Sequence, residues 1–182
     1  VVRRAVVAHC LAGSLGQIIL YAGPPGSGKS SLAATLPRLM DGQSEAIPVR
    51  PGWLDATDIL GYFDPRQNRF VPAPFLDCVL EAHHSQGSGV LHTIILDELN
   101  IARIGNYGAD LLSQLEKAHV DGESGLLRLF APSIQIELDR GVLAQFDQGI
   151  ESRLAPIGAT LSIPRNLLLA GTLNHDESTE ML

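Results

Sequence analysis

The chain has 182 residues, of which 45% are hydrophobic and 18% are charged, and its formal net charge is −7. This balance is typical of one folded domain with its own core and excludes an intrinsically disordered chain. The acidic charge argues against a surface that coats nucleic acid or an anionic membrane, and no apolar run is long enough to span a bilayer. Two cysteines, Cys10 and Cys78, are too few for a disulfide framework and predict free thiols in a reducing compartment, the cytoplasm.

Helical and strand-like patterns alternate along the chain. Helical spacing of apolar residues predicts helices over 1–16, 30–40, 53–62, 73–84 and 104–118, with Pro37 ending or kinking the second of them. Short apolar runs predict strands over 17–22, 46–50, 91–96 and 166–171. Residues 119–165 show only short β-like stretches, at 133–138 and 160–163. This alternation predicts an α/β fold with a mostly parallel central sheet.

A loop rich in glycine joins the first predicted strand to the next helix. Residues 23–30 fit the pattern G-x-x-x-x-G-K-[S/T], in which glycines let successive backbone N–H groups face an anion at a helix N-terminus. Lys29 is expected to reach the β- and γ-phosphates of a nucleotide, and Ser30 to give a hydroxyl to Mg²⁺. A glycine-rich turn with a solvent-facing lysine is the alternative. The predicted nucleotide-binding residues are Gly23, Pro24, Pro25, Gly26, Ser27, Gly28, Lys29, Ser30 and Ser31.

Polar residues follow two of the later predicted strands. Asp97 and Glu98 come directly after the strand at 91–96, at the edge of a parallel sheet where ligands bind. Asp97 is suited to hold hydrated Mg²⁺, and Glu98 to polarise a water for attack on the γ-phosphate. Asn174 follows the strand at 166–171 and could reach that water or the γ-phosphate from between the other two strand tips. By spacing alone, however, an asparagine there is more often a turn residue.

Four blocks of the sequence together match one family pattern. They are residues 23–30 (Walker A), 53–65 with Phe70 and Pro72, 94–103 (Walker B) and 163–179 (sensor 1). With these blocks the chain resembles the AAA+ ATPases, in the branch of McrB-type restriction GTPases, MoxR-like chaperones and dynein-related proteins. Asp-Glu-x-Asn after Walker B, combined with Gly-Thr-x-Asn-x-Asp-Glu-Ser-Thr, is similar specifically to McrB-like members. The blocks extend over nearly the whole chain except residues 119–162.

The resemblance implies the P-loop NTPase three-layer sandwich of the AAA+ large subdomain. It implies Glu98 as catalytic base and Asn174 as the sensor 1 residue, acting with Lys29. It also implies a homo-oligomeric ring, expected to be a hexamer, whose sites are completed by an arginine from the neighbour. We expect residues 1–182 to form one such subdomain, truncated before the arginine finger and the helical lid and therefore weakly active alone. Arg103 and Arg153 could face a neighbouring subunit, although a solvated arginine is more common.

The expected function is Mg²⁺-dependent binding and hydrolysis of ATP or GTP. The resemblance favours the motor of a McrB-like DNA restriction or defence system, with a nuclease partner and with DNA bound by another domain or subunit. McrB-type members use GTP, but their Met-Asn-Thr-Ala-Asp pattern is not reproduced at residues 173–176, which favours ATP and leaves GTP open. The alternatives are a MoxR-like chaperone that remodels proteins, a non-hydrolysing nucleotide-sensing assembly module and, more weakly, a small-molecule kinase.

Two further groups of residues admit both a structural and a functional interpretation. His83 and His84 are adjacent on a predicted helix and point in different directions, which favours surface histidines over a metal site. Aromatic residues bracket the segment after the second strand and are expected to pack locally, the alternative being a surface that faces a pore or partner. These aromatic residues are Trp53, Tyr62, Phe63 and Phe70.

Overall fold

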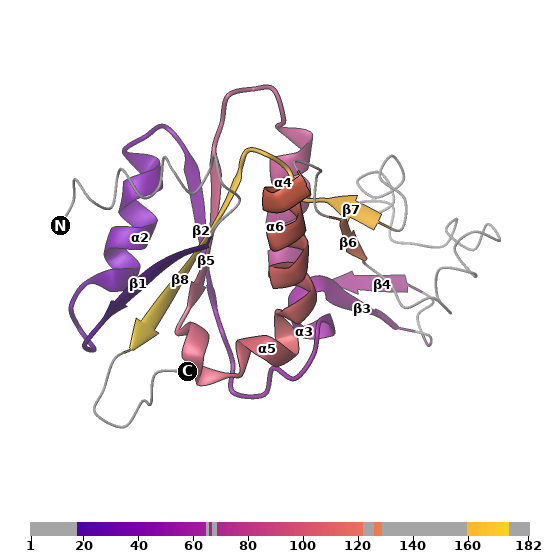
Figure 1. Ribbon diagram of the computed structural model, residues 1–182, viewed down its shortest axis with the longest axis horizontal. Coiled ribbons are helices and arrows are strands. Elements are labelled where there is room, and N and C mark those ends of the chain that lie inside the picture. The colour runs from indigo at the N-terminus through magenta and orange to yellow at the C-terminus, as the bar shows by residue number, and fades with distance from the viewer. Residues whose placement is uncertain (1–17, 65, 67–68, 122–125, 129–159, 175–182) are drawn as a thin grey trace.

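The computed structural model describes residues 18–64, 66, 69–121, 126–128 and 160–174, which form three layers (Figure 1). The middle layer is a parallel sheet of four strands in the order β1-β8-β5-β2. Helix α2 covers one face, and helices α4 and α6 lie on the other. The predicted α/β fold with a mostly parallel central sheet is confirmed. The strands are β1 (Ile18–Gly23), β2 (Gln43–Pro48), β5 (His92–Asp97) and β8 (Leu167–Asn174).

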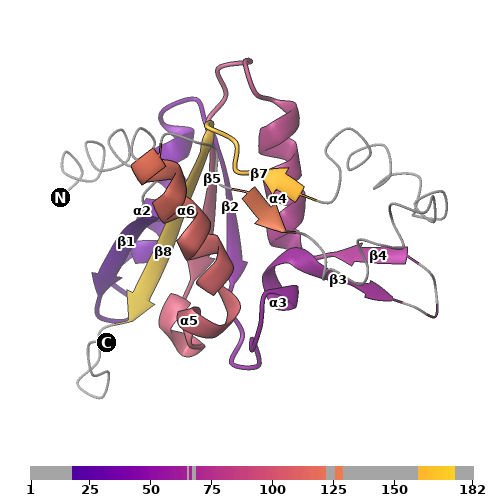
Figure 2. The same cartoon turned by 45° about the vertical axis from the view of Figure 1, so that its right-hand side comes forward.

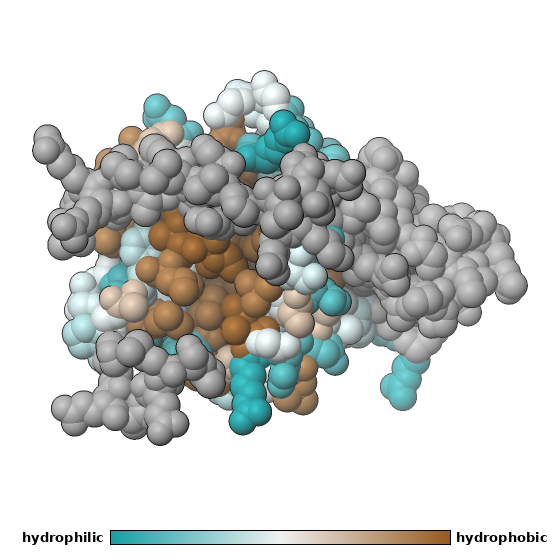
Figure 3. Space-filling model, viewed as in Figure 1, coloured by the Kyte–Doolittle hydropathy of each residue, from teal (hydrophilic) through white to brown (hydrophobic). Residues whose placement is uncertain are grey.

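The sheet separates two hydrophobic clusters, because successive side chains of a strand point to opposite faces. In β5, Ile95 packs toward α2 with Ala33, whereas Ile94 and Leu96 belong to the larger cluster with α4. The two interior strands, β5 and β8, are buried along most of their length, which explains their continuous apolar sequences. On β1 no described helix covers Leu20, which is 54% exposed. Figure 3 shows hydrophobic residues gathered at the surface over the strands in this view.

Helices α2 (Lys29–Arg38) and α4 (Pro74–His84) agree with the predicted helices at 30–40 and 73–84. Pro37 lies in the last turn of α2, and the N–H of Gly42 donates to its carbonyl oxygen at 2.9 Å. The helix therefore ends where the proline was expected to end it. Pro74 opens α4, a position where its missing N–H leaves no helical hydrogen bond unmade.

The predicted helix at 53–62 is mostly wrong. Only α3 (Thr57–Leu60) is helical, because the Asp55 carboxylate accepts a hydrogen bond from the N–H of Thr57 at 2.8 Å and forms a turn just before the helix. A hydrogen bond from the Thr57 hydroxyl and then the one from its N–H lower the pKa of Asp55. The helix ends at Gly61, whose φ of 105° lies in the left-handed region. The chain then forms β3 (Gly61–Asp64), which pairs antiparallel with β4 (Arg69–Pro72) as a small separate sheet (Figure 2).

The predicted helix at 104–118 is two helices, α5 (Ile104–Tyr107) and α6 (Ala109–Asp121), which break at Gly108. A short 3₁₀ helix, η1 (Leu99–Ile101), precedes them. The Tyr107 hydroxyl donates to the carbonyl oxygen of Leu99 at 3.1 Å, and its ring meets Trp53 edge-on at 5.1 Å. Tyr107 thus ties α5 to the segment after β5. Burial raises the pKa of Tyr107 to about 12.

The remaining described segment is a second small antiparallel pair, which the sequence prediction covered only in part. Strand β7 (Thr160–Ser162) lies within the stretch predicted at 160–163, and it pairs with β6 (Leu126–Arg128), which was not predicted. The helix predicted at 1–16 and the strand predicted at 133–138 lie outside the described residues. Within the described part of the chain, no helix has the length and apolar character needed to cross a membrane.

Candidate functional site

The carboxyl ends of three strands bring the predicted site residues to one edge of the sheet. Strand β8 lies between β1 and β5, with Gly23 of β1 opposite Asn174 and Leu96 of β5 opposite Gly171. Since the strands are parallel, the glycine-rich loop after β1 and the acids at the end of β5 flank the polar end of β8. Asn174 therefore lies between the other two strand tips, as expected.

The glycine-rich loop turns tightly before α2. Gly26 and Gly28 have φ values of 72° and 82°, which favour glycine, and the N–H of Ser27 donates to the carbonyl oxygen of Pro24 at 3.3 Å. Lys29 is the first residue of α2, and its Nζ donates to the same Pro24 carbonyl at 2.8 Å. The loop thus precedes a ten-residue helix whose first-turn N–H groups have no partner within the helix.

Ser30 and Asp97 lie in direct contact although they come from distant parts of the sequence. The Ser30 hydroxyl donates to Asp97 Oδ1 at 2.6 Å. The hydroxyl of Thr172, on β8, donates to the same oxygen at 2.6 Å. Two hydroxyl groups from two different elements therefore hold the Asp97 carboxylate.

Thr172 also contacts Glu98 and is the site residue that the sequence prediction missed. The Glu98 N–H donates to Thr172 Oγ1 at 2.9 Å, and Thr172 is 1% exposed. Thr172 stood in the block resembling sensor 1 but was given no role. The signal that could have found it is its position two residues before Asn174, on the same face of the strand.

Asn174 is the last residue of β8 and not a turn residue, so the interpretation from spacing alone is wrong. Its Nδ2 donates to Glu98 Oε1 at 2.9 Å. Its backbone carbonyl accepts a hydrogen bond from Asn100 Nδ2 at 3.3 Å. Glu98 has a left-handed backbone, with φ of 57° and ψ of 50°, and its side chain is exposed to the site. The Glu98 carboxylate is thus held at one oxygen by Asn174.

These residues surround a cavity of about 350 Å³. The loop, the start of α2, the end of β8 and Glu98 all contribute to its wall, and Asp97 lies next to it through Ser30 and Thr172. Its lining contains cationic, hydroxyl, amide and carboxylate groups on one open surface, which suits a polyanion together with a cation. The lining residues are Pro25, Gly26, Gly28, Lys29, Ser30, Ser31, Glu98, Thr172 and Asn174.

None of the other candidates that the structure describes is among the residues lining this cavity. Arg103 is exposed, while Arg153 lies outside the described residues. Of the aromatic group, Trp53 packs locally against Tyr107, whereas Tyr62 is 53% exposed. The side chains of residues 63 and 70 are outside the described part of the structure.

The two adjacent histidines lie in the last turn of α4. His84 Nδ1 is 2.7 Å from the carbonyl oxygen of Leu80, one helical turn earlier, and the rings of His83 and His84 are 6.5 Å apart. Among the described residues, no three His, Cys, Asp or Glu side chains are grouped as metal ligands.

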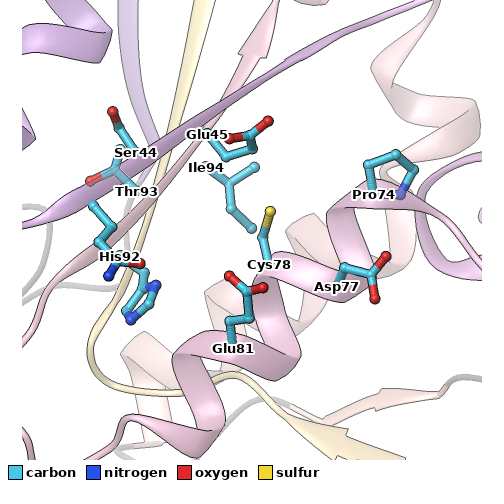
Figure 4. A pocket seen from close by; sticks show the side chains of 10 residues that line it. Ser44, Glu45, Pro74, Asp77, Cys78, Glu81, His92, Thr93 and Ile94 are labelled. Carbon is cyan, nitrogen blue, oxygen red and sulfur yellow. The ribbon is translucent and has the colours of Figure 1, made fainter. Parts of the chain in front are cut away.

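A second cavity, of about 280 Å³, lies beside β2 and α4, at the opposite edge of the sheet from β1 (Figure 4). Cys78 projects from α4 toward Ile94 and Glu45. Burial, and then the negative charges of Glu45, Glu81 and Asp77, raise the pKa of Cys78 to about 11. Cys78 is a free thiol, protonated at neutral pH, and Cys10 lies outside the described residues.

Comparison with solved structures finds distant neighbours, whereas the sequence comparisons find none. No family model matches this chain, and no curated protein matches it. The solved structure of PCH-2 from C. elegans aligns over 98% of this chain at 14% identity with a TM-score of 0.37. The alignment covers 38% of the PCH-2 chain, so this chain spans well under half the length of that protein. A likeness at this level does not place the chain in a family.

Proposed function

We propose that this chain binds a nucleoside triphosphate with Mg²⁺, hydrolyses it, and forms the α/β nucleotide-binding subdomain of a AAA+ ATPase. The observation that carries the proposal is the meeting of three strand ends around one cavity. Lys29 and Ser30 from the loop lie there together with Glu98 and Asn174, beside Asp97. The strand order brings these groups, each with its own chemical role, to one place. A glycine-rich turn that binds no nucleotide would not require polar residues at the ends of the neighbouring strands.

Phosphate binding is assigned to the loop and the N-terminus of α2. The loop glycines and the unpaired first-turn N–H groups favour an anion, which the partial positive charge of the helix end also attracts. Lys29 Nζ donates to Pro24 in this structure, and an ammonium has two further protons to give to phosphate oxygens. Pro24, Ser27 and Ser31 are assigned to the same loop site.

Mg²⁺ fits the donor groups that Ser30 and Asp97 supply. Because the Ser30 hydroxyl proton is directed to Asp97, the lone pairs of its oxygen remain for a cation. Mg²⁺ prefers oxygen ligands and commonly takes one or two from the protein, with phosphates and waters completing the set. When bound, it would neutralise charge that develops on the transferring phosphate.

Hydrolysis is assigned to Glu98 as general base. Asn174 holds Glu98 Oε1, which leaves Oε2 to accept a proton from a water. The water oxygen bonds to the γ-phosphorus, the bond from that phosphorus to the bridging oxygen breaks, and the water proton moves to Glu98. The described residues that line the cavity do not distinguish the base of the nucleotide, so ATP is proposed from the sequence, with GTP as the alternative.

The finer assignment rests on sequence resemblance. We propose a homo-oligomeric ring, a hexamer, that serves as the motor of a McrB-like DNA restriction system with a nuclease partner. Residues 1–182 would form one subdomain, with the arginine finger and the lid supplied by other segments or subunits. Asn100 of the McrB-like signature donates to the backbone carbonyl of Asn174. A MoxR-like chaperone and a non-hydrolysing sensing module are the alternatives.

The test measures nucleotide binding and phosphate release by the wild type and three variants. Lys29→Ala is expected to lose binding of fluorescent ATP and GTP analogues, while alanine at the other lysine, Lys117, is the matched control. Glu98→Gln keeps an oxygen for Asn174, so it should bind normally while phosphate release falls about 100-fold or more. Intact binding by Lys29→Ala contradicts the phosphate site, and normal hydrolysis by Glu98→Gln contradicts the base. In a longer protein that includes the lid, wild-type binding without phosphate release would favour the sensing module.

A further inference from the structure

We propose that Thr172 is a positioning residue of this site, whose hydroxyl couples the orientation of Asp97 to that of Glu98. The inference rests on the proposed function, because it assigns a metal role to one acid and a base role to the other. It goes further by naming a third residue of the cavity wall, which acts through its hydrogen bonds to both acids.

The hydrogen bonds of Thr172 use its hydroxyl as donor and acceptor at once. Its proton goes to Asp97 Oδ1 at 2.6 Å, and its oxygen accepts the Glu98 N–H at 2.9 Å. A hydroxyl is among the few side-chain groups that can do both at one atom. Since Thr172 is 1% exposed, water has little access to replace either bond when the hydroxyl is removed.

The bond to Glu98 acts on a strained part of the backbone. Glu98 is a non-glycine residue in the left-handed region, a conformation that persists only where the surroundings hold it. Its N–H bond to Thr172 ties that backbone to β8, the same strand whose Asn174 holds the Glu98 carboxylate. Loss of the Thr172 hydroxyl is therefore expected to free the Glu98 backbone and displace its carboxylate from the cavity.

The bond to Asp97 acts on the carboxylate assigned to the metal. Ser30 of α2 and Thr172 of β8 donate to the same oxygen of Asp97. With Thr172 gone, Ser30 alone holds the carboxylate and its rotation is less restricted. Mutation of a residue that hydrogen-bonds a metal ligand commonly lowers metal affinity or activity by about 10–100-fold.

The test compares Thr172→Val with Thr93→Val, a matched control. Thr93 lies on the neighbouring strand β5 and is 2% exposed, but its hydroxyl has no hydrogen-bond partner within the described structure. Affinity for a fluorescent ATP analogue is measured in EDTA and against rising Mg²⁺, together with phosphate release and thermal unfolding. In EDTA, Thr172→Val should bind the ATP analogue with the affinity of the wild type. The Mg²⁺ concentration that gives half of the gain in affinity should rise, and the rate of phosphate release should fall, each by about 10–100-fold. Thr172→Ser should restore both, and Thr93→Val should match the wild type in Mg²⁺ requirement and rate of phosphate release.

The outcomes separate this proposal from the proposed function. If wild-type protein fails to bind the analogue, the proposed function is wrong and the role of Thr172 is wrong with it. If the wild type binds and hydrolyses while folded Thr172→Val has the same Mg²⁺ requirement and rate, only the role of Thr172 is overturned. Should Thr172→Val not fold, Thr172→Ser and Thr172→Ala replace it, because both lose the methyl group and only serine keeps the hydroxyl. Equal Mg²⁺ requirements in those two variants would also overturn the proposal.

Discussion

Replacing Thr93 by valine is expected to stabilise the protein. Thr93 is 2% exposed in the interior strand β5, and its Oγ1 has no hydrogen-bond partner among the described groups. A buried hydroxyl without a partner costs about 1–3 kcal/mol. Valine keeps the branched shape and strand preference of threonine while replacing the hydroxyl with a methyl group of nearly the same size. We therefore expect the free energy of unfolding to rise by about 1 kcal/mol, at the low end of that penalty.

Urea unfolding provides the measurement. The midpoint should rise at an unchanged slope, and for a domain of this size the melting temperature should rise by about 2–4 °C. Thr172→Val is the opposite control, because it leaves Asp97 and the Glu98 N–H each without one hydrogen bond and should lower the free energy of unfolding by about 1–3 kcal/mol. If Thr93→Val is instead destabilised as much as Thr172→Val, the Thr93 hydroxyl has a buried partner such as an ordered water, and the reasoning fails.

Two other changes test the fold. Gly61→Ala should lose about 2 kcal/mol or more, because Gly61 has φ of 105° and a Cβ there would contact Val71 O and lie 2.7 Å from the Cα of Pro72. Gly52→Ala, which meets no atom within 4 Å, should stay within about 0.5 kcal/mol in the same urea titration, and similar losses in both variants would refute the strain. The pKa of Tyr107 rises from 10.0 to about 12 on folding, so the unfolded chain ionises first and the free energy of unfolding should fall as pH rises from 10 toward 12. Tyr107→Phe should flatten that fall in urea titrations between pH 8 and 11.5, and an unchanged pH dependence would exclude Tyr107 as its source.

The interior of the sheet was predictable from sequence because its strands are buried on both faces. Strands β5 and β8 agree with the apolar runs at 91–96 and 166–171 apart from their ends. The edge strand shows the limit of that signal. β2 was predicted at 46–50 but spans Gln43–Pro48, and its first residues include the exposed Gln43 and Glu45. An edge strand has less apolar surface to bury, so its sequence marks its position less clearly.

The two incorrect helices failed for local reasons that apolar spacing does not register. At 53–62, the Asp55 carboxylate and the left-handed Gly61 confine the helix to four residues. At 104–118, the apolar face is correct, since Tyr107, Leu111 and Leu115 are all buried in one cluster. Gly108 nevertheless divides the helix. Periodicity therefore predicted which side chains enter the core but not where the backbone changes direction.

The candidate site was predicted residue by residue from motifs, but the connection between those residues depends on strand order. With β8 placed beside β5, the pairing of Leu96 with Gly171 brings Thr172 level with Asp97, and alternation then puts Thr172 and Asn174 on the same side of β8. Two residues of strand separate them by about 7 Å. The inner one, Thr172, is consequently buried and meets the Asp97 carboxylate and the Glu98 backbone, whereas the outer one, Asn174, meets the Glu98 side chain at the cavity. Strand β8 thus holds Glu98 at both its backbone N–H and its carboxylate. A search for such partners should therefore look two residues before a polar residue at a strand end.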